Sequence, residues 1–181
     1  KFSNLIGSSD SDTGDRGKLK VTLHHNYWAE GVSQRMPRAR FGQIHVVNNY
    51  YRSTGNDYCI GAGYEADLLI ENNVFEVTDN PIKYIGGAAT AAELKNNLFV
   101  NVTGNKTSQG TAFTPPYPYT MTPVEDVENV VRFTAGRRDL NDIICGPTIT
   151  TDCNGFPNGT AYTDSCGICV GGDTELIPCS G

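Results

Sequence analysis

Short runs of alternating apolar and polar residues recur along the N-terminal part of the chain. The first two runs place apolar side chains at every second position, as in Leu19, Val21 and Leu23 and again in Ile44 and Val46. Alternation with a period of two is the pattern of a β-strand with one buried face. We therefore expect short strands joined by turns over this part of the chain.

An asparagine ends each of four such runs at a nearly constant interval. The spacings are 23, 24 and 24 residues, and the positions are Asn26, Asn49, Asn73 and Asn97. Two residues after each asparagine stands an aromatic residue, namely Trp28, Tyr51, Phe75 and Phe99. A repeat of this length without room for two helices is typical of a solenoid, here a parallel β-helix of about four coils. Equivalent side chains would lie about 4.8 Å apart, so we expect a ladder of asparagine amides and a stack of rings.

A helical period appears after residue 121. Thr122, Pro123 and Glu125 match a capping box with proline at the first helical position. Four valines follow at helical spacing, at positions 124, 127, 130 and 131. We expect a short amphipathic helix over residues 123–134 that lies on the solenoid.

The cysteines gather in the C-terminal tail, where glycine, threonine and aspartate also become frequent. Five of the six cysteines lie in the last 37 residues. Such a density is typical of a disulfide-stapled module in an oxidising compartment. We therefore expect two domains, residues 1–140 and 141–181, with the second a linker or attachment module of a secreted, extracellular protein.

The disulfide pairing remains open at this point. The four cysteines from Cys153 to Cys179 allow three pairings, and Cys145 could pair with Cys59 or within the tail. The Cys166 and Cys169 pair leaves a zinc site as an alternative, although the tail contains no histidine.

Charge divides the chain in a different way. The formal net charge is -6, but residues 1–52 carry eight Lys and Arg against four acids, whereas the remaining residues carry six against sixteen. An acidic chain with a basic patch fits a polyanion or a small anionic ligand better than nucleic acid.

No run of 18 apolar residues occurs, so we expect no membrane partner. We expect a monomer, and we interpret the start at Lys1 without Met as a processed or truncated end.

The basic residues concentrate in one motif. It reads Arg35-x-Pro37-x-x-Arg40-x-Gly42-x-x-His45-x-x-Asn48-Asn49, and it follows Leu5-Ile6-Gly7-Ser8-Ser9-Asp10 and Val21-Thr22-Leu23-His24-His25-Asn26. Over about residues 1–136 these stretches resemble the pectate and pectin lyases, a family of polysaccharide lyases. The resemblance implies an all-β, right-handed parallel β-helix that cleaves polygalacturonate by β-elimination. It also implies that N-terminal coils of the catalytic domain precede Lys1.

The resemblance assigns roles to the basic residues. Arg35 is implied as the Brønsted base that removes the C5 proton of galacturonate, and Arg40 as the ligand of the substrate carboxylate. We expect Arg38 to contribute to substrate binding beside them, and His45 matches a family position that supports the arginine groove. The family has a substrate-binding lysine near the start of this segment, and Lys1 is the nearest candidate, although the aligned position holds Phe2.

The chemistry of β-elimination fits a cluster of cations. The proton that leaves is α to a carboxylate and weakly acidic, so the site must neutralise the charge that develops there. A guanidinium matches a carboxylate in two-point geometry. Since arginine is normally permanently charged, an arginine base leads us to expect an alkaline optimum.

Spacing adds a structural condition. Positions 35 and 40 differ by an odd number, so on one regular strand their side chains would point to opposite faces. Both reach one groove only if the chain bends, and Pro37 is placed to bend it.

Calcium is the cofactor that the resemblance implies, with its main ligands upstream of this chain. Six residues of the chain are weak candidate ligands because they offer hard oxygens: Asp10, Asp12, Asp15, Asp152, Asn154 and Asp164. The alternatives are a pectin lyase, which acts on methylated substrate without Ca2+, and a non-catalytic pectin-binding β-helix. Endo or exo action stays open, and so does the activity of this segment on its own.

Overall fold

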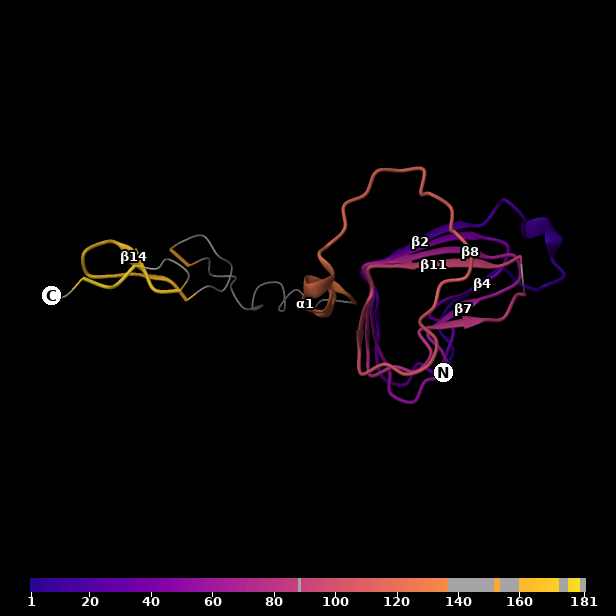
Figure 1. Ribbon diagram of the computed structural model, residues 1–181, viewed down its shortest axis with the longest axis horizontal. Coiled ribbons are helices and arrows are strands. Elements are labelled where there is room, and N and C mark those ends of the chain that lie inside the picture. The colour runs from indigo at the N-terminus through magenta and orange to yellow at the C-terminus, as the bar shows by residue number, and fades with distance from the viewer. Residues whose placement is uncertain (88, 137–151, 154–159, 173–175, 180–181) are drawn as a thin grey trace. The chain divides into compact units, whose positions relative to one another are not determined.

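Three parallel sheets surround the core of the N-terminal part of the molecule (Figure 1). The computed structural model describes residues 1–87, 89–136, 152–153, 160–172 and 176–179. The chain separates into two compact units, Lys1–Gly136 and Arg137–Gly181. In the first unit each sheet has four strands, and their pairings are parallel. This confirms the parallel β-helix that the asparagine repeat predicts.

Each coil contributes one strand to each sheet. Sheet 1 has the order β1 (Leu5–Ile6), β4 (Arg38–Ala39), β7 (Ile60–Ala62) and β10 (Ile82–Tyr84). Sheet 2 contains β2 (Lys20–His24), β5 (Gln43–Val47), β8 (Asp67–Glu71) and β11 (Ala91–Lys95). Sheet 3 contains β3 (Tyr27–Trp28), β6 (Tyr50–Arg52), β9 (Val74–Glu76) and β12 (Leu98–Val100). A 3-10 helix, η1 (Thr13–Asp15), lies in the loop between β1 and β2.

The alternating residues fill the core as the pattern predicts. In sheet 2, Ile44 pairs with Val21 on one side and with Leu68 on the other. Ile44, Val46 and Leu68 are fully buried. Residues of equal position in successive coils therefore stack on one another, which is how a repeat of 23 or 24 residues builds one continuous core.

The asparagine ladder occupies the turn between sheets 2 and 3. The amide nitrogen of Asn26 donates to the Asn49 oxygen at 2.9 Å, that of Asn49 to Asn73 at 3.0 Å, and that of Asn73 to Asn97 at 2.9 Å. Asn49 and Asn73 are completely buried. Burial of these amides is tolerated because each coil supplies hydrogen-bond partners for the next.

The first residue of each pair has a separate function that the sequence pattern did not indicate. His25, Asn48, Asn72 and Asn96 all have positive φ, between 46° and 52°. Asparagine tolerates the left-handed region better than most residues, so the doubled asparagine supplies both the turn and the ladder.

The aromatic residues stack as expected. Ring centroids are 4.7 Å apart from Trp28 to Tyr51, 4.4 Å from Tyr51 to Phe75 and 5.4 Å from Phe75 to Phe99. A second stack joins Tyr27 and Tyr50 at 5.0 Å.

The amphipathic helix is α1 (Val124–Thr134), and its buried Val127 and Val131 pack against Tyr50 and Val74 of sheet 3. The expected capping box is wrong, because no side chain caps this helix. The Thr122 hydroxyl lies 3.0 Å from His25 Nε2 instead.

None of the described helices has the length and apolar character needed to cross a bilayer.

The tail unit is held by two disulfides, Cys153–Cys169 and Cys166–Cys179. These bonds exclude the zinc alternative for the four cysteines. The strands β13 (Tyr162–Thr163) and β14 (Cys169–Val170) pair in antiparallel fashion. Cys145 lies outside the described residues, and Cys59 is a free thiol buried in the β-helix, where burial raises its pKa to about 12.

Candidate active site

The arginine motif bends as its spacing requires. The Met36–Pro37 peptide bond is cis, and both Arg35 and Phe41 have positive φ, 67° and 54°. Met36 is fully buried, which anchors the bend in the core. The stretch from 35 to 40 is therefore not one regular strand, and the odd spacing of Arg35 and Arg40 does not force them apart.

Arg38 and Arg40 lie on the outer face of sheet 1. Between them Ala39 is completely buried, so its neighbours point outward. A Cβ atom on Gly61 would lie 3.2 Å from Cγ of Arg38, and one on Gly63 would lie 3.1 Å from Cγ of Arg40. Each arginine thus extends over a glycine of the next coil, which leaves room for its side chain.

Arg40 is neutralised within the protein. Its Nε donates to the Asp10 carboxylate, and its Nη1 donates to the carbonyl oxygens of Gly7 at 3.2 Å and Ser8 at 3.4 Å. The Arg40 side chain is 11% exposed, whereas that of Asp10 is 55% exposed. Because Nε and Nη1 are occupied, Nη2 is the nitrogen that remains for an external ligand.

Arg35 and Arg38, unlike Arg40, have no counter-ion among the described residues. No described carboxylate lies within ion-pair distance of either guanidinium. The Nε atoms of both side chains are buried without a hydrogen-bond acceptor among the described residues. The uncompensated positive charge of the motif therefore belongs to Arg35 and Arg38.

Phe2, and not Lys1, contacts the arginine motif. The Arg35 guanidinium carbon lies 4.4 Å from the centroid of the Phe2 ring, an arrangement typical of a cation–π contact. The terminal ammonium group of Lys1 donates to the Gly31 carbonyl and the Ser33 hydroxyl, both at 3.1 Å. Among the described residues no hydrogen bond or ion pair joins the Lys1 side chain to the arginines, so Lys1 as a substrate ligand stays a prediction.

His45 lies in sheet 2 and is separate from the arginines. It is 1% exposed, with Nε2 at 2.8 Å from the Glu71 carboxylate and Nδ1 at 2.8 Å from the Tyr117 hydroxyl. The Tyr119 hydroxyl donates to the same Glu71 oxygen at 2.6 Å, which raises the pKa of Tyr119 to about 12. The Tyr117 hydroxyl also lies 2.5 Å from that of Thr22. His45 therefore holds the connection before α1 onto sheet 2, and its role in substrate binding stays a prediction.

A cavity of about 560 Å³ lies beside this network. His24 and His25 help to line it, with their Nδ1 atoms 3.1 Å apart. Burial and the neighbouring His24 ring lower the pKa of His25. Neither histidine contacts the arginine motif.

The candidate calcium ligands of the N-terminal loop form no shared metal site. In the N-terminal loop, Asp10 binds Arg40 and Asp12 accepts a hydrogen bond from Ser8 at 2.9 Å, while Asp15 lies in η1. The carboxylate clusters of the described residues include no group around Asp10, Asp12 and Asp15 that could hold a metal ion. These residues therefore do not fit the cation.

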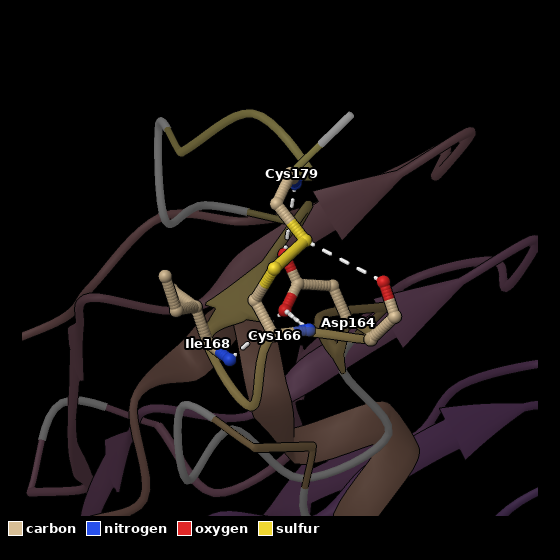
Figure 2. The surroundings of a disulfide bond; sticks show 5 residues. Asp164, Cys166, Ile168 and Cys179 are labelled. Atoms are coloured by element: carbon tan, nitrogen blue, oxygen red, sulfur yellow. Dashed lines mark hydrogen bonds between the residues drawn. A yellow bond between two sulfur atoms is a disulfide. The ribbon is translucent and has the colours of Figure 1, made fainter. Parts of the chain in front are cut away.

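The tail candidates do not fit calcium either, because the group around Asp164 is completed by Cys166 and Cys179, which form a disulfide and offer no thiolate to a metal. The Asp164 carboxylate accepts backbone N–H groups of Cys166, Ile168 and Cys179 at 2.9 to 3.0 Å, as Figure 2 shows. Asp152 accepts a hydrogen bond from the Ala161 N–H at 3.2 Å. Asn154 lies outside the described residues. Asp164 thus binds the backbone at both cysteines of the Cys166–Cys179 disulfide, and these backbone bonds lower its pKa.

Two parts of the site were missing from the sequence interpretation. The ion pair of Arg40 joins residues 30 positions apart, and Glu71 lies 26 positions from its partner His45. The separation of 26 is close to the period of the repeat, so placing residues of adjacent coils side by side could have found Glu71, whereas Asp10 lies in a loop outside the repeat pattern.

Comparison with known proteins agrees with this architecture. Residues 1–135 match the family model described as pectate lyase. The chain is 38% identical over 141 residues to a pectate trisaccharide-lyase of Bacillus licheniformis, covering 77% of this chain and 40% of that protein. It is 37% identical over 153 residues to a pectate lyase of Bacillus subtilis, covering 77% of this chain and 36% of the relative.

A solved structure is similar in fold. A pectate lyase bound to hexasaccharide superposes with a TM-score of 0.64 at 33% identity, and the match covers 75% of this chain and 37% of that one. The chain thus spans about two fifths of the length of the curated relatives that it matches.

Proposed function

The chain belongs to the pectate lyase family, and from this membership we propose that the full-length protein cleaves polygalacturonate by β-elimination. The observation that carries the proposal is the unequal pairing of the three arginines. Arg40 has an internal counter-ion, whereas Arg35 and Arg38 have none among the described residues. A site with two uncompensated cations suits a substrate that carries a carboxylate on every sugar.

In the proposed reaction Arg35 is the base, and it acts after its guanidinium group has lost a proton to solvent, because the protonated form has no lone pair to accept another. It takes the C5 proton of a galacturonate, the C5–H electron pair forms the C4–C5 double bond, and the C4–O bond breaks. The leaving oxygen receives a proton from water. The carboxylate attached to C5 gains negative charge in the transition state, and the uncompensated Arg38 stabilises that charge.

Arg40 holds the substrate from a fixed position. Asp10 and two backbone carbonyls orient its guanidinium, which leaves Nη2 to donate to a substrate carboxylate. This predicts a one-point contact, in place of the two-point contact expected from the sequence motif alone.

The partner and location follow from the same proposal. The substrate is the polyanionic polysaccharide of pectin, and the two disulfides of the tail fit a secreted protein. The family resemblance implies calcium as well. Because the described carboxylates of this chain do not fit the ion, no step here runs through it.

The test uses the full-length protein with polygalacturonate, following the ultraviolet absorbance of the 4,5-unsaturated product. We expect Arg35→Lys to lower kcat by about 100-fold or more, as loss of a general base does. Arg52→Lys is the matched control, because Arg52 is on sheet 3 and pairs with Glu76 at 3.2 Å. A nearly unchanged rate in Arg35→Lys would remove Arg35 from the role of base.

The alternatives give different results in the same assay. Faster turnover of methylated pectin than of polygalacturonate would identify a pectin lyase. Binding of polygalacturonate without any rise in absorbance would identify a non-catalytic pectin-binding protein, and the proposed function would then be wrong.

A further inference from the structure

Lys83 lies in line with Arg38 on the outer face of sheet 1. In the strand register of sheet 1, Arg38 pairs with Gly61, and Gly61 pairs with Lys83 of β10. The neighbouring Ile60 and Ile82 are buried, so residues at the paired positions point outward. Gly61 has no side chain, and the space over it is shared by Arg38 with the side chains of Tyr58 and Ile85, which lie 2.9 and 3.2 Å from the position of a Cβ there.

The ammonium group of Lys83 is held close to the sheet. It lies 2.9 Å from a carboxylate oxygen of Asp57 and 5.2 Å from the centroid of the Tyr58 ring. Tyr58 is 2% exposed, and its ring approaches to 2.9 Å of the position that a Cβ on Gly61 would occupy. A buried ring therefore supports the lysine, and the charge is positioned before any ligand binds.

Arg38 and Lys83 together define a direction. They are two strands apart, which corresponds to about 10 Å, and the line between them crosses the strands. Along the strand the next outward cation is Arg40, whose side chain is 11% exposed and ion-paired to Asp10. Lys83 is ion-paired too, to Asp57, but its side chain is 46% exposed, so a linear polyanion reaches Lys83 more easily than Arg40.

We propose that Lys83 is a further carboxylate-binding residue for polygalacturonate, at a sugar beyond the one held at the arginines. This inference rests on the proposed function and extends it to substrate length. The pectate lyase of similar fold that is bound to hexasaccharide shows that a related protein holds a chain of several sugars. An oligosaccharide too short to reach β10 does not touch Lys83, and a longer chain does.

The experiment compares Lys83→Gln with the wild-type full-length protein on two substrates, trigalacturonate and long polygalacturonate. We expect the KM for the polymer to rise about fivefold, with kcat nearly unchanged, because the contact is the same in the ground and transition states. The KM for trigalacturonate should stay within about twofold of the wild-type value. Lys95→Gln is the matched control, because Lys95 is also exposed and pairs with one carboxylate, Glu93, at 3.1 Å.

Equal effects of Lys83→Gln on both substrates, or no effect on either, would overturn the inference. Binding measured by calorimetry decides the matter independently of turnover, since the Kd for the polymer should rise and that for trigalacturonate should not. A wild-type protein that forms no unsaturated product contradicts the proposed function, and the calorimetric comparison still tests the Lys83 contact.

Discussion

At the scale of single residues, the behaviour of each arginine depends on what it touches. Arg40 donates to Asp10 and to two backbone carbonyls, whereas Arg35 faces the ring of Phe2 and Arg38 extends over Gly61. Three guanidinium groups within six positions of the sequence therefore have three different environments. Their chemical type alone does not assign their roles.

Asp10 moderates the attraction between the arginines and an anionic substrate. Asp10→Asn keeps an oxygen that accepts a hydrogen bond from Arg40 but removes the charge. We expect the Kd of the full-length protein for polygalacturonate to fall about threefold at low salt, and the difference to shrink as salt screens it.

Asp12→Asn is the control for this change, because Asp12 is in the same loop and its partner is Ser8. An unchanged Kd in Asp10→Asn, measured by calorimetry at low salt, would mean that the pair does not affect binding.

At the scale of elements, the repeat made much of the fold predictable. The ladder of Asn26, Asn49, Asn73 and Asn97 and the aromatic stack follow from one period, because stacked coils bring equal positions together. The helix over 124–134 was also predictable from its valines. Its capping box failed because the helix begins at Val124 with Pro123 as its N-cap, and the Thr122 hydroxyl lies beside His25 Nε2 at 3.0 Å.

The residues around the site were less predictable for a related reason. Asp10 reaches Arg40 from a loop without a repeat pattern, and His45 meets two tyrosines of a connection that crosses sheet 2. Such contacts depend on where irregular segments settle on the coils. Periodicity predicts the coils but not the paths of these segments.

The ladder gives a stability prediction. Asn73 is fully buried, its amide group donates to Val46, Glu71 and Asn97, and its oxygen accepts from Asn49. Asn73→Ala leaves these buried groups without partners, and we expect a loss of about 2–4 kcal/mol in the free energy of unfolding.

Thermal unfolding followed by circular dichroism measures this loss as a lower Tm. Asn26→Ala provides the comparison, because Asn26 has a ladder neighbour on one side only and is exposed to a greater extent. If both variants have the same Tm, the ladder does not contribute cooperatively to stability.

At the scale of the whole molecule, the two units are stabilised by different means. The unit Lys1–Gly136 has a continuous core of buried apolar residues, and its described cysteine, Cys59, is a free thiol. In the tail two disulfides and the Asp164 hydrogen bonds order short segments with few buried apolar side chains. Short segments that bury few apolar side chains depend on such cross-links.

Reduction of the disulfides should therefore destabilise the tail and leave the β-helix folded. We expect dithiothreitol to make the tail sensitive to protease while the Tm of the β-helix changes by less than about 2 °C. Limited proteolysis and calorimetry of the same sample measure both effects. A large fall in the β-helix Tm on reduction would show that its stability depends on the tail.

The stack that begins at Trp28 has a practical consequence. Trp28 is the single tryptophan of the chain, and it lies against Tyr51 at one end of the four-ring column. Intrinsic fluorescence therefore reports on that end of the molecule, so an emission change during unfolding would reveal whether the coils separate one after another or all together.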